Sequence, residues 1–284
     1  MIYDRITKET VLEKVYENRT MQFLYNTTLG GLCVLFLRLP VVSKIYGLFQ
    51  KNKRSKNKIE EMVNEYGIDM TGFSEDFRSF NDFIARKRPY AGFTENNDFL
   101  IAPADSCVIA YMISEGSIIP VKGKAYTLAQ FLKDDNLARD YEGGIFLVFR
   151  LRVYDYHRFC FVDDGSIISH KRISGFLDSV NTDATGRFTL SSNYREVSLL
   201  ESNNFDNIVF VEVGAMLVGR IIQTHDKTNF RKGDEKGYFE FGGSSIVLLL
   251  KKDIVHIDDD ILSYSAKGIE TKVSLGERIG AKRV

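Results

Sequence analysis

The stretch GYFEFGGSSIVLLL, residues 237–250, joins two apolar segments through the link Gly242–Gly243–Ser244–Ser245. In most proteins such a link between two strands is a bend or a bulge. Glycines before a serine also leave the preceding carbonyl unshielded and let the backbone take strained angles. The Ser244 hydroxyl is then able to attack the Gly243 carbonyl and replace the amide with an ester.

Strand signals recur on both sides of this stretch. Runs rich in β-branched and aromatic residues occupy 145–162, 207–222 and 244–257, bounded by Gly, Asp and Asn clusters. The tripeptide DDG at 163–165 predicts a hairpin. From about residue 100 onward the chain is therefore expected to be mainly β, with few helices.

The N-terminal part has a different pattern. Residues 1–21 are polar with scattered apolar positions and look helical. In the following segment, 22–50, the longest uncharged run has 16 residues, whereas a membrane span needs about 20. Two short helices that meet near Pro40 and lie in the membrane interface fit this segment better. The alternative is a helical hairpin in the core of a soluble domain.

A basic run, KNKRSKNK at 51–58, follows directly. Such runs are usually solvated, but beside an apolar hairpin this one favours anionic lipid head groups, at about 1 kcal/mol per basic residue. Residues 59–70 return to an amphipathic helical pattern. The expected fold class is α+β: N-terminal membrane-associating helices over 1–69, then a mainly antiparallel β catalytic domain over 70–284.

The overall composition limits the partners. Basic and acidic residues balance at 38 each, so no global field favours nucleic acid. The three cysteines, Cys33, Cys107 and Cys160, lack metal-type spacing, so a reducing compartment and no metal are expected. The first twenty residues lack the apolar block of a secretory signal. The expected location is peripheral, on the cytoplasmic face of the cell membrane.

Two further segments carry candidate chemistry. In VYDYHRFC, residues 153–160, Asp155 and His157 would share a face of a regular strand. A carboxylate beside an imidazole fixes its tautomer and raises its pKa, which suits a general acid near neutral pH. The alternative is a structural pair at a strand end. Asp105, in IAPADSCV, is the kind of residue that usually occupies a turn.

A short basic run, Arg86–Lys87–Arg88 in ARKRPY, is the remaining segment of interest. Such runs are more often solvated, and the alternative is a site for a lipid phosphate.

The order of these segments along the chain is more specific than any one of them. The chain resembles the pyruvoyl-dependent phosphatidylserine decarboxylases over roughly residues 70 to 280. The blocks that carry the resemblance are FNDFIARKRPY (80–90), APAD (102–105), KGKAYTLAQFL (122–132), DYHRF (155–159), NYRE (193–196), VEVGAMLVGRI (211–221), KGDEKGYFEFGGSS (232–245) and LGERIG (275–280).

The resemblance implies a lyase made as a zymogen. The proenzyme would cut itself between Gly243 and Ser244 into a β chain, 1–243, and an α chain, 244–284. Ser244 would become a covalent pyruvoyl group, which forms a Schiff base with phosphatidylserine and acts as an electron sink for decarboxylation to phosphatidylethanolamine. The implied partners are phosphatidylserine, an anionic membrane surface and the two chains of one precursor; a homodimer, common in the family, is left open.

The resemblance also assigns residues. His157 matches the histidine of the decarboxylation step, and Asp105 and Asp155 match acidic residues that support self-cleavage. At the family's usual second histidine, the base that activates the serine, this chain has Cys160. Ser245 is a rival cleavage point, but no glycine precedes it.

Three interpretations follow from Cys160. In the first, the thiol acts as the base, provided that a neighbouring cation lowers its pKa. In the second, which we rank first, His157 serves both steps and is oriented by Asp155 or Asp105. In the third, processing is absent and the chain is a phosphatidylserine-binding homologue without decarboxylase activity. A pyruvoyl decarboxylase acting on a soluble amino acid is a further rival, but it would need neither the apolar hairpin nor the basic run 51–58.

Overall fold

The computed structural model describes residues 1–13, 20, 22–24, 27–37, 39–73, 76–88, 93–121, 124–177, 190–215, 220–240 and 244–283. Gly243 lies outside these described residues, whereas Ser244 lies within them.

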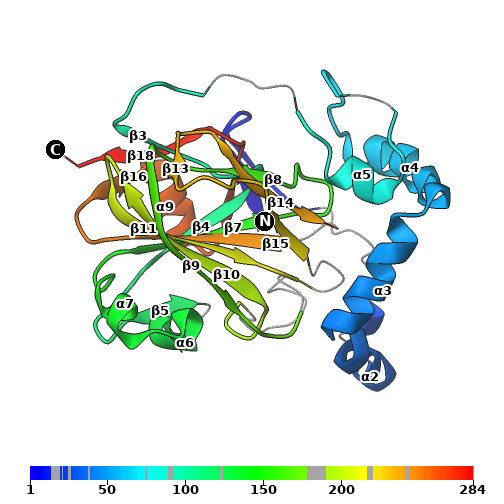
Figure 1. The fold of residues 1–284 in the computed structure, drawn as a ribbon, viewed down its shortest axis with the longest axis horizontal. Coiled ribbons are helices and arrows are strands. Elements are labelled where there is room, and N and C mark those ends of the chain that lie inside the picture. Colours follow the sequence, from blue (N-terminus) through cyan, green and yellow to red (C-terminus); the bar gives the residue numbers. More distant parts are fainter. Residues whose placement is uncertain are drawn as a thin grey trace.

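A ten-stranded sheet forms the centre of the molecule (Figure 1). Its strand order is β13-β9-β10-β11-β15-β7-β4-β17-β1-β2, and the pairs are antiparallel except for β1 with β17. In that order the strands span Asn229–Phe230, Gly165–Ile173, Arg195–Ser202, Asp206–Val213, Ser244–Leu250, Ile145–Leu151, Ser106–Met112, Glu270–Val273, Ile2–Asp4 and Glu9–Val11. The mainly β character expected from the sequence is confirmed.

Three smaller sheets complete the β structure. They are β12-β14-β8, β16-β18-β3 and the hairpin β5-β6. Their strands span Arg220–Gln223, Glu235–Glu240 and Arg158–Cys160; Val255–Ile257, Arg278–Lys282 and Phe99–Ile101; and Ile118–Val121 and Lys124–Thr127. The described helices are α2 (Thr28–Leu37), α3 (Pro40–Gln50), η1 (Lys53–Lys56), α4 (Asn57–Tyr66), α5 (Phe80–Ile84), α6 (Leu128–Leu132), α7 (Asp135–Arg139) and α9 (Asp259–Ala266).

Strand β15 lies in the middle of the large sheet, and all of its residues are buried. Ile246 and Leu248 belong to an apolar cluster shared with α5, β8, β14 and the sheet β16-β18-β3. Val247 and Leu249, on the opposite face, belong to a second cluster with α6 and α7. A strand covered on both faces is apolar throughout rather than alternating, which explains the unbroken run IVLLL.

The helical prediction for residues 1–21 is wrong at β1 and β2. Ile2 and Tyr3 are buried, and Tyr3 stacks on Tyr264 with ring centroids 3.8 Å apart. Arg5 binds the carboxylates of Asp258, Asp260 and Glu277. The partners of this segment come from the far end of the chain, so the local pattern could not indicate them. The predicted division of the chain at residue 70 stays a prediction.

The two short helices expected around Pro40 are present as α2 and α3, which extend away from the sheets (Figure 1). Pro40 begins α3, a position where the missing N–H costs nothing. Leu32, Phe36, Leu48 and Phe49 are 65–70% exposed. The alternative of a hairpin within a soluble core is therefore wrong. None of the described helices is long and apolar enough to cross a membrane.

Two local strand predictions also need correction. The apolar run 145–162 is not one strand, because β7 ends at Leu151 and residues 152–157 turn before β8 begins at Arg158. The tripeptide DDG at 163–165 does not form a hairpin. Strand β8 pairs with β14, whereas β9 pairs with β10 and β13, so this turn carries the chain from one sheet to another.

Candidate active site

The predicted site residues gather where several strands of the large sheet begin or end. Ser244, at the start of β15, lies opposite Leu151, at the end of β7. Ser245 lies opposite Val213, at the end of β11. Strand β4 runs antiparallel beside β7, so its start, directly after Asp105, belongs to the same end of the sheet.

Ser244 is fully buried. Its Oγ has no hydrogen-bond partner among the described residues. Leaving a buried hydroxyl without a partner costs about 1–3 kcal/mol, and such orphan groups are rare in folded proteins. Ser244 is therefore held in a position that stability alone would not favour.

His157 is also fully buried, in the turn between β7 and β8. Its Nδ1 lies 2.9 Å from the carbonyl oxygen of Asp155. A carbonyl oxygen only accepts, so Nδ1 carries the proton and Nε2 is the basic nitrogen of the ring. The His157 carbonyl accepts a hydrogen bond from the Phe239 N–H at 3.0 Å.

The geometry corrects two expectations about this pair. Asp155 and His157 do not share the face of a strand, and the backbone carbonyl of Asp155, not its carboxylate, holds the imidazole. Burial lowers the pKa of His157 to about 4, outweighing the opposite effect of Asp155. At neutral pH the ring is therefore uncharged, the form that can accept a proton, and it is not the raised-pKa acid expected from the sequence.

The two predicted aspartates are paired with arginines. The Asp155 carboxylate accepts from the backbone N–H of Arg152 and from its guanidinium, each at 2.7 Å. The Asp105 carboxylate accepts from Arg88 at 2.9 Å and from the backbone N–H of Leu275 at 2.7 Å. Both aspartates thus fasten the turns around His157 and before β4.

Backbone bonds connect the predicted residues with the ends of β7, β14 and β15. Leu151, the last residue of β7, pairs with Ser244, and His157, in the turn after β7, bonds to Phe239 near the end of β14. We treat His157 and Ser244 as one candidate constellation.

The comparison with known proteins identifies a family. A family profile described as phosphatidylserine decarboxylase matches residues 79–281. The chain belongs to the phosphatidylserine decarboxylase family.

Three relatives are similar over nearly their whole length. The chain is 45% identical to "Phosphatidylserine decarboxylase proenzyme 2" of Clostridium acetobutylicum, covering 98% of this chain and 97% of the relative. It is 40% identical to the phosphatidylserine decarboxylase proenzymes of Clostridium botulinum (strain 657 / Type Ba4) and Clostridium perfringens (strain ATCC 13124), with 99% of both chains covered in each case.

Cys160 occupies a different place from His157 in this decarboxylase-family chain. It lies opposite Glu235 at the start of β14, whereas His157 bonds to Phe239 near the end of that strand, from which the chain continues toward Ser244. Burial raises the pKa of the Cys160 thiol well above its ordinary value, and the nearby Asp234 adds to this shift. The thiol is therefore protonated at neutral pH.

A buried polar network beside β15 and β11 was not predicted from the sequence. Lys236 of β14 forms an ion pair with Glu212 of β11, and both side chains are buried. Tyr194 donates its hydroxyl to Glu196 at 2.7 Å. Hydrogen bonds, chiefly with His170, overcome burial and lower the pKa of Glu196 to about 2. The only available signal was that four of these residues lie in blocks shared with the decarboxylase family.

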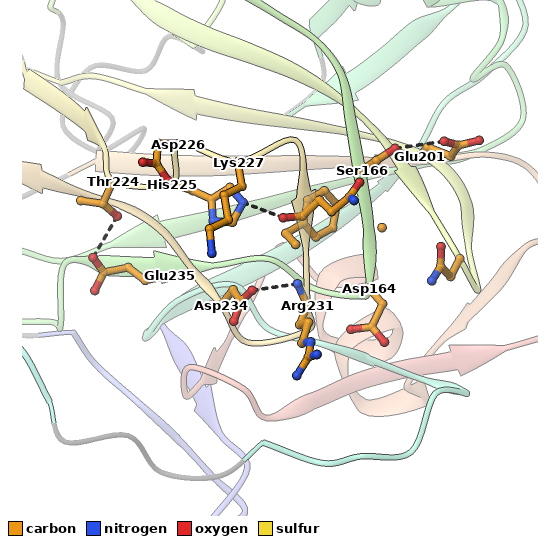
Figure 2. A pocket seen from close by; sticks show the side chains of 14 residues that line it. Asp164, Ser166, Glu201, Thr224, His225, Asp226, Lys227, Arg231, Asp234 and Glu235 are labelled. Carbon is orange, nitrogen blue, oxygen red and sulfur yellow. Dashed lines mark hydrogen bonds between the residues drawn. The ribbon is translucent and has the colours of Figure 1, made fainter.

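A surface hollow of about 950 Å³ lies elsewhere, at the Glu235 end of β14 (Figure 2). Some of its side chains bind one another or the backbone: Thr224 donates to Glu235 at 2.9 Å, and His225 Nε2 lies 3.0 Å from the Asn229 carbonyl oxygen. None of the predicted site residues lines it. In the part of the chain that the structure describes, no three His, Cys, Asp or Glu side chains are grouped to hold a metal.

The low pKa of His157 predicts a dependence of stability on pH. Between pH 4 and 6.5 the unfolded chain binds a proton at this histidine that the folded chain does not. The free energy of unfolding should therefore rise with pH across this window, by up to about 1.4 kcal/mol per pH unit, and level off above it.

Chemical denaturation of Ser244→Ala and of Ser244→Ala/His157→Gln, both expected to stay uncut, at a series of pH values measures this contribution as the difference in slope. Ser244→Ala/His256→Gln, which changes an exposed histidine, is the matched control and should keep the slope of Ser244→Ala. Identical slopes in Ser244→Ala and Ser244→Ala/His157→Gln would contradict a depressed pKa.

Proposed function

We propose that this chain is a self-processing phosphatidylserine decarboxylase that cuts itself between Gly243 and Ser244. The observation that carries the proposal is the buried Ser244 hydroxyl, which has no hydrogen-bond partner among the described residues, together with the neutral ring of His157. Membership of the decarboxylase family and relatives named as proenzymes support it.

Self-cleavage requires a base for the Ser244 hydroxyl, and we assign this role to His157. Ser244 Oγ attacks the Gly243 carbonyl carbon, and its proton passes to Nε2 of His157. The Gly243–Ser244 C–N bond then breaks, the Ser244 nitrogen takes that proton from His157, and an ester joins the two residues. Loss of the Cα proton of Ser244 then expels the Gly243 carboxylate, and water replaces the nitrogen, which leaves as ammonia. The chains 1–243 and 244–284 result.

The surroundings of Ser244 fit the pyruvoyl group that the family implies. The site is buried, and pairing of Ser244 with β7 and of Ser245 with β11 would hold the new chain end in place. When formed, this group supplies a carbonyl that condenses with the substrate amine and withdraws electrons. His157 is placed to return a proton to the carbon from which carbon dioxide leaves. Asp155 and Asp105 act as positioning residues through Arg152 and Arg88.

The helical hairpin α2–α3 is proposed to lie on the cytoplasmic face of the cell membrane. Its exposed apolar side chains would insert between lipids. The five basic residues of 51–58 are exposed beside it, where they would attract anionic head groups. Lys51 also binds Glu240 at 2.8 Å, so this surface ends close to the predicted cleavage site.

Replacing Ser244 tests the self-cleavage directly. Ser244→Ala should remain a single chain of 32.4 kDa, because no other hydroxyl follows a glycine at this turn. The neighbouring buried residue gives a matched control, since Ser245→Ala should still be cut. Intact-mass measurement reads both, and the wild type should give two chains. A folded wild type that stays uncut would overturn the proposal in favour of a phosphatidylserine-binding homologue without activity.

The choice of base is tested by two further variants. His157→Ala should slow cutting at least about 100-fold, the usual size of a general-base contribution. Cys160→Ala should be cut at close to the wild-type rate, because its thiol is protonated and distant along β14 from Ser244. Time courses of cutting after in vitro synthesis measure both rates. Cutting that survives in His157→Ala but is lost in folded Cys160→Ala would reverse the assignment.

Membrane binding is tested at the hairpin. The double variant Leu48→Glu/Phe49→Glu should weaken binding to vesicles containing phosphatidylserine at least about 100-fold, because two exposed apolar side chains are lost from the interface. Ile168→Glu changes an exposed apolar residue of β9 and is the control. Co-sedimentation with vesicles measures both, and equal binding of the double variant and the control would refute this role of the hairpin.

A further inference from the structure

Arg86 is a buried cation directly after α5. Its side chain is enclosed by aromatic rings: the guanidinium carbon lies 4.7 Å from the ring centre of Phe83, 5.2 Å from that of Phe73 and 5.9 Å from that of Tyr156. The residue is only 5% exposed. These rings hold the guanidinium in place and shield it from water.

This guanidinium lacks the partner that a buried charge normally has. One nitrogen donates to the Phe83 carbonyl at 3.2 Å, but Nε has no hydrogen-bond partner among the described residues. Arg86 also makes no ion pair with a carboxylate in the described ranges, whereas Arg88 and Arg152 each do. Burial lowers the pKa of Arg86 to about 10, and the nearby Asp105 opposes this only in part. A buried charge without a bonded counter-charge is costly, so an anionic ligand that bonds to it would relieve that cost.

The position of Arg86 lies between the apolar hairpin and the predicted catalytic residues. Helix α5, which it follows, contacts α3 of the hairpin. On the other side, the hydroxyl of Tyr156, next to His157, accepts a hydrogen bond from the backbone N–H of Arg88. Arg86 is close enough to His157 to oppose protonation of its ring. Going inward, the order is therefore apolar surface, Arg86, His157.

A serine phospholipid has the same order of groups: acyl chains, phosphodiester, then the amino acid. We propose that Arg86 binds the phosphodiester of the substrate and so sets how deeply the head group enters the site. This inference rests on the proposed function, since it deepens the recognition of that substrate. A guanidinium suits the role because its planar donors match two phosphate oxygens at once.

The substrate carboxylate is the other anion in the head group, and the chemistry argues against it as the ligand of Arg86. The carboxylate loses its charge as carbon dioxide leaves, so a cation bound to it would stabilise the ground state more than the transition state. The phosphodiester keeps its charge through the reaction. Binding energy gained there anchors the substrate without opposing the chemical step.

Soluble compounds that contain only one of the two anions separate these ligands. Glycerophosphocholine has the phosphodiester but no carboxylate and no primary amine, and O-acetylserine has the amine and carboxylate but no phosphate. Titration calorimetry and 31P NMR on the processed protein measure binding of the first. Rates of carbon dioxide release measure the use of O-acetylserine and of glycerophosphoserine.

Arg86→Met should weaken glycerophosphocholine binding about 10- to 100-fold, the effect of losing hydrogen bonds from a charged donor. It should raise the KM for glycerophosphoserine by a similar factor and leave kcat/KM for O-acetylserine close to that of the wild type. Lys252→Met, which removes an exposed cation in the turn after β15, is the matched control and should change none of these values. Equal losses on both substrates, with unchanged glycerophosphocholine binding, would overturn the inference in favour of a structural or carboxylate-binding role.

Arg86→Lys covers the case in which Arg86→Met does not fold. It keeps the charge but not the paired donors, so glycerophosphocholine should bind several-fold more weakly while the use of O-acetylserine is unchanged; no change in either would overturn the inference. Failure of the proposed function is seen separately, in the wild type, as absence of cutting and of carbon dioxide release. Failure of this inference is seen in an active wild type whose Arg86 variants do not distinguish the two anions.

Discussion

The burial of β15 between β7 and β11 is the constraint on which the rest of the structure depends. Its backbone bonds to a strand on each side, and apolar clusters cover both of its faces. A strand held in this way has no freedom to shift its register, because a slip of one residue would exchange the two faces. Ser244, its first residue, is therefore fixed against Leu151.

This fixed point also explains why the polar residues around it are arranged by arginines. The turn from Leu151 to His157 must cross from one sheet to another without regular backbone pairing. Arg152 fastens it through Asp155, and Arg88 fastens the turn before β4 through Asp105. Both aspartates form ion pairs with these arginines and not with the imidazole. The buried imidazole is left neutral, with its orientation set by a backbone carbonyl.

Much of the fold could be predicted from the sequence because its strongest signals are local. The β-branched and aromatic runs became β7, β11 and β15, and the break at Pro40 separates two helices. The errors arose where distant residues decide the local structure. Residues 2–4 form a strand because β17, more than 260 residues away, offers an unpaired edge. Residues 152–157 form a turn because Asp155 binds Arg152 and His157 binds Phe239.

The identity of the candidate site residues could be predicted from the sequence, but the contacts between them could not. The resemblance to the family named Ser244, His157, Asp105 and Asp155, and spacing alone suggested that Asp155 contacts His157 through its carboxylate. The structure gives that contact to the backbone carbonyl, which no sequence pattern reveals. The isolation of Arg86 was likewise invisible in the basic run that contains it, because a missing partner is a property of the packed molecule.

The segment that begins at Ser244 contributes strands to sheets that are otherwise built from residues before it. It supplies β15 inside the large sheet, β17 between β4 and β1, and β18 beside β3. If the chain is cut before Ser244, the ten-stranded sheet and the sheet β16-β18-β3 are each divided between the two products. Reassembly after unfolding then requires two separate molecules to meet. The continuous chain would therefore have to fold before it is cut. After the cut, the two separate chains would refold together less readily than the continuous chain.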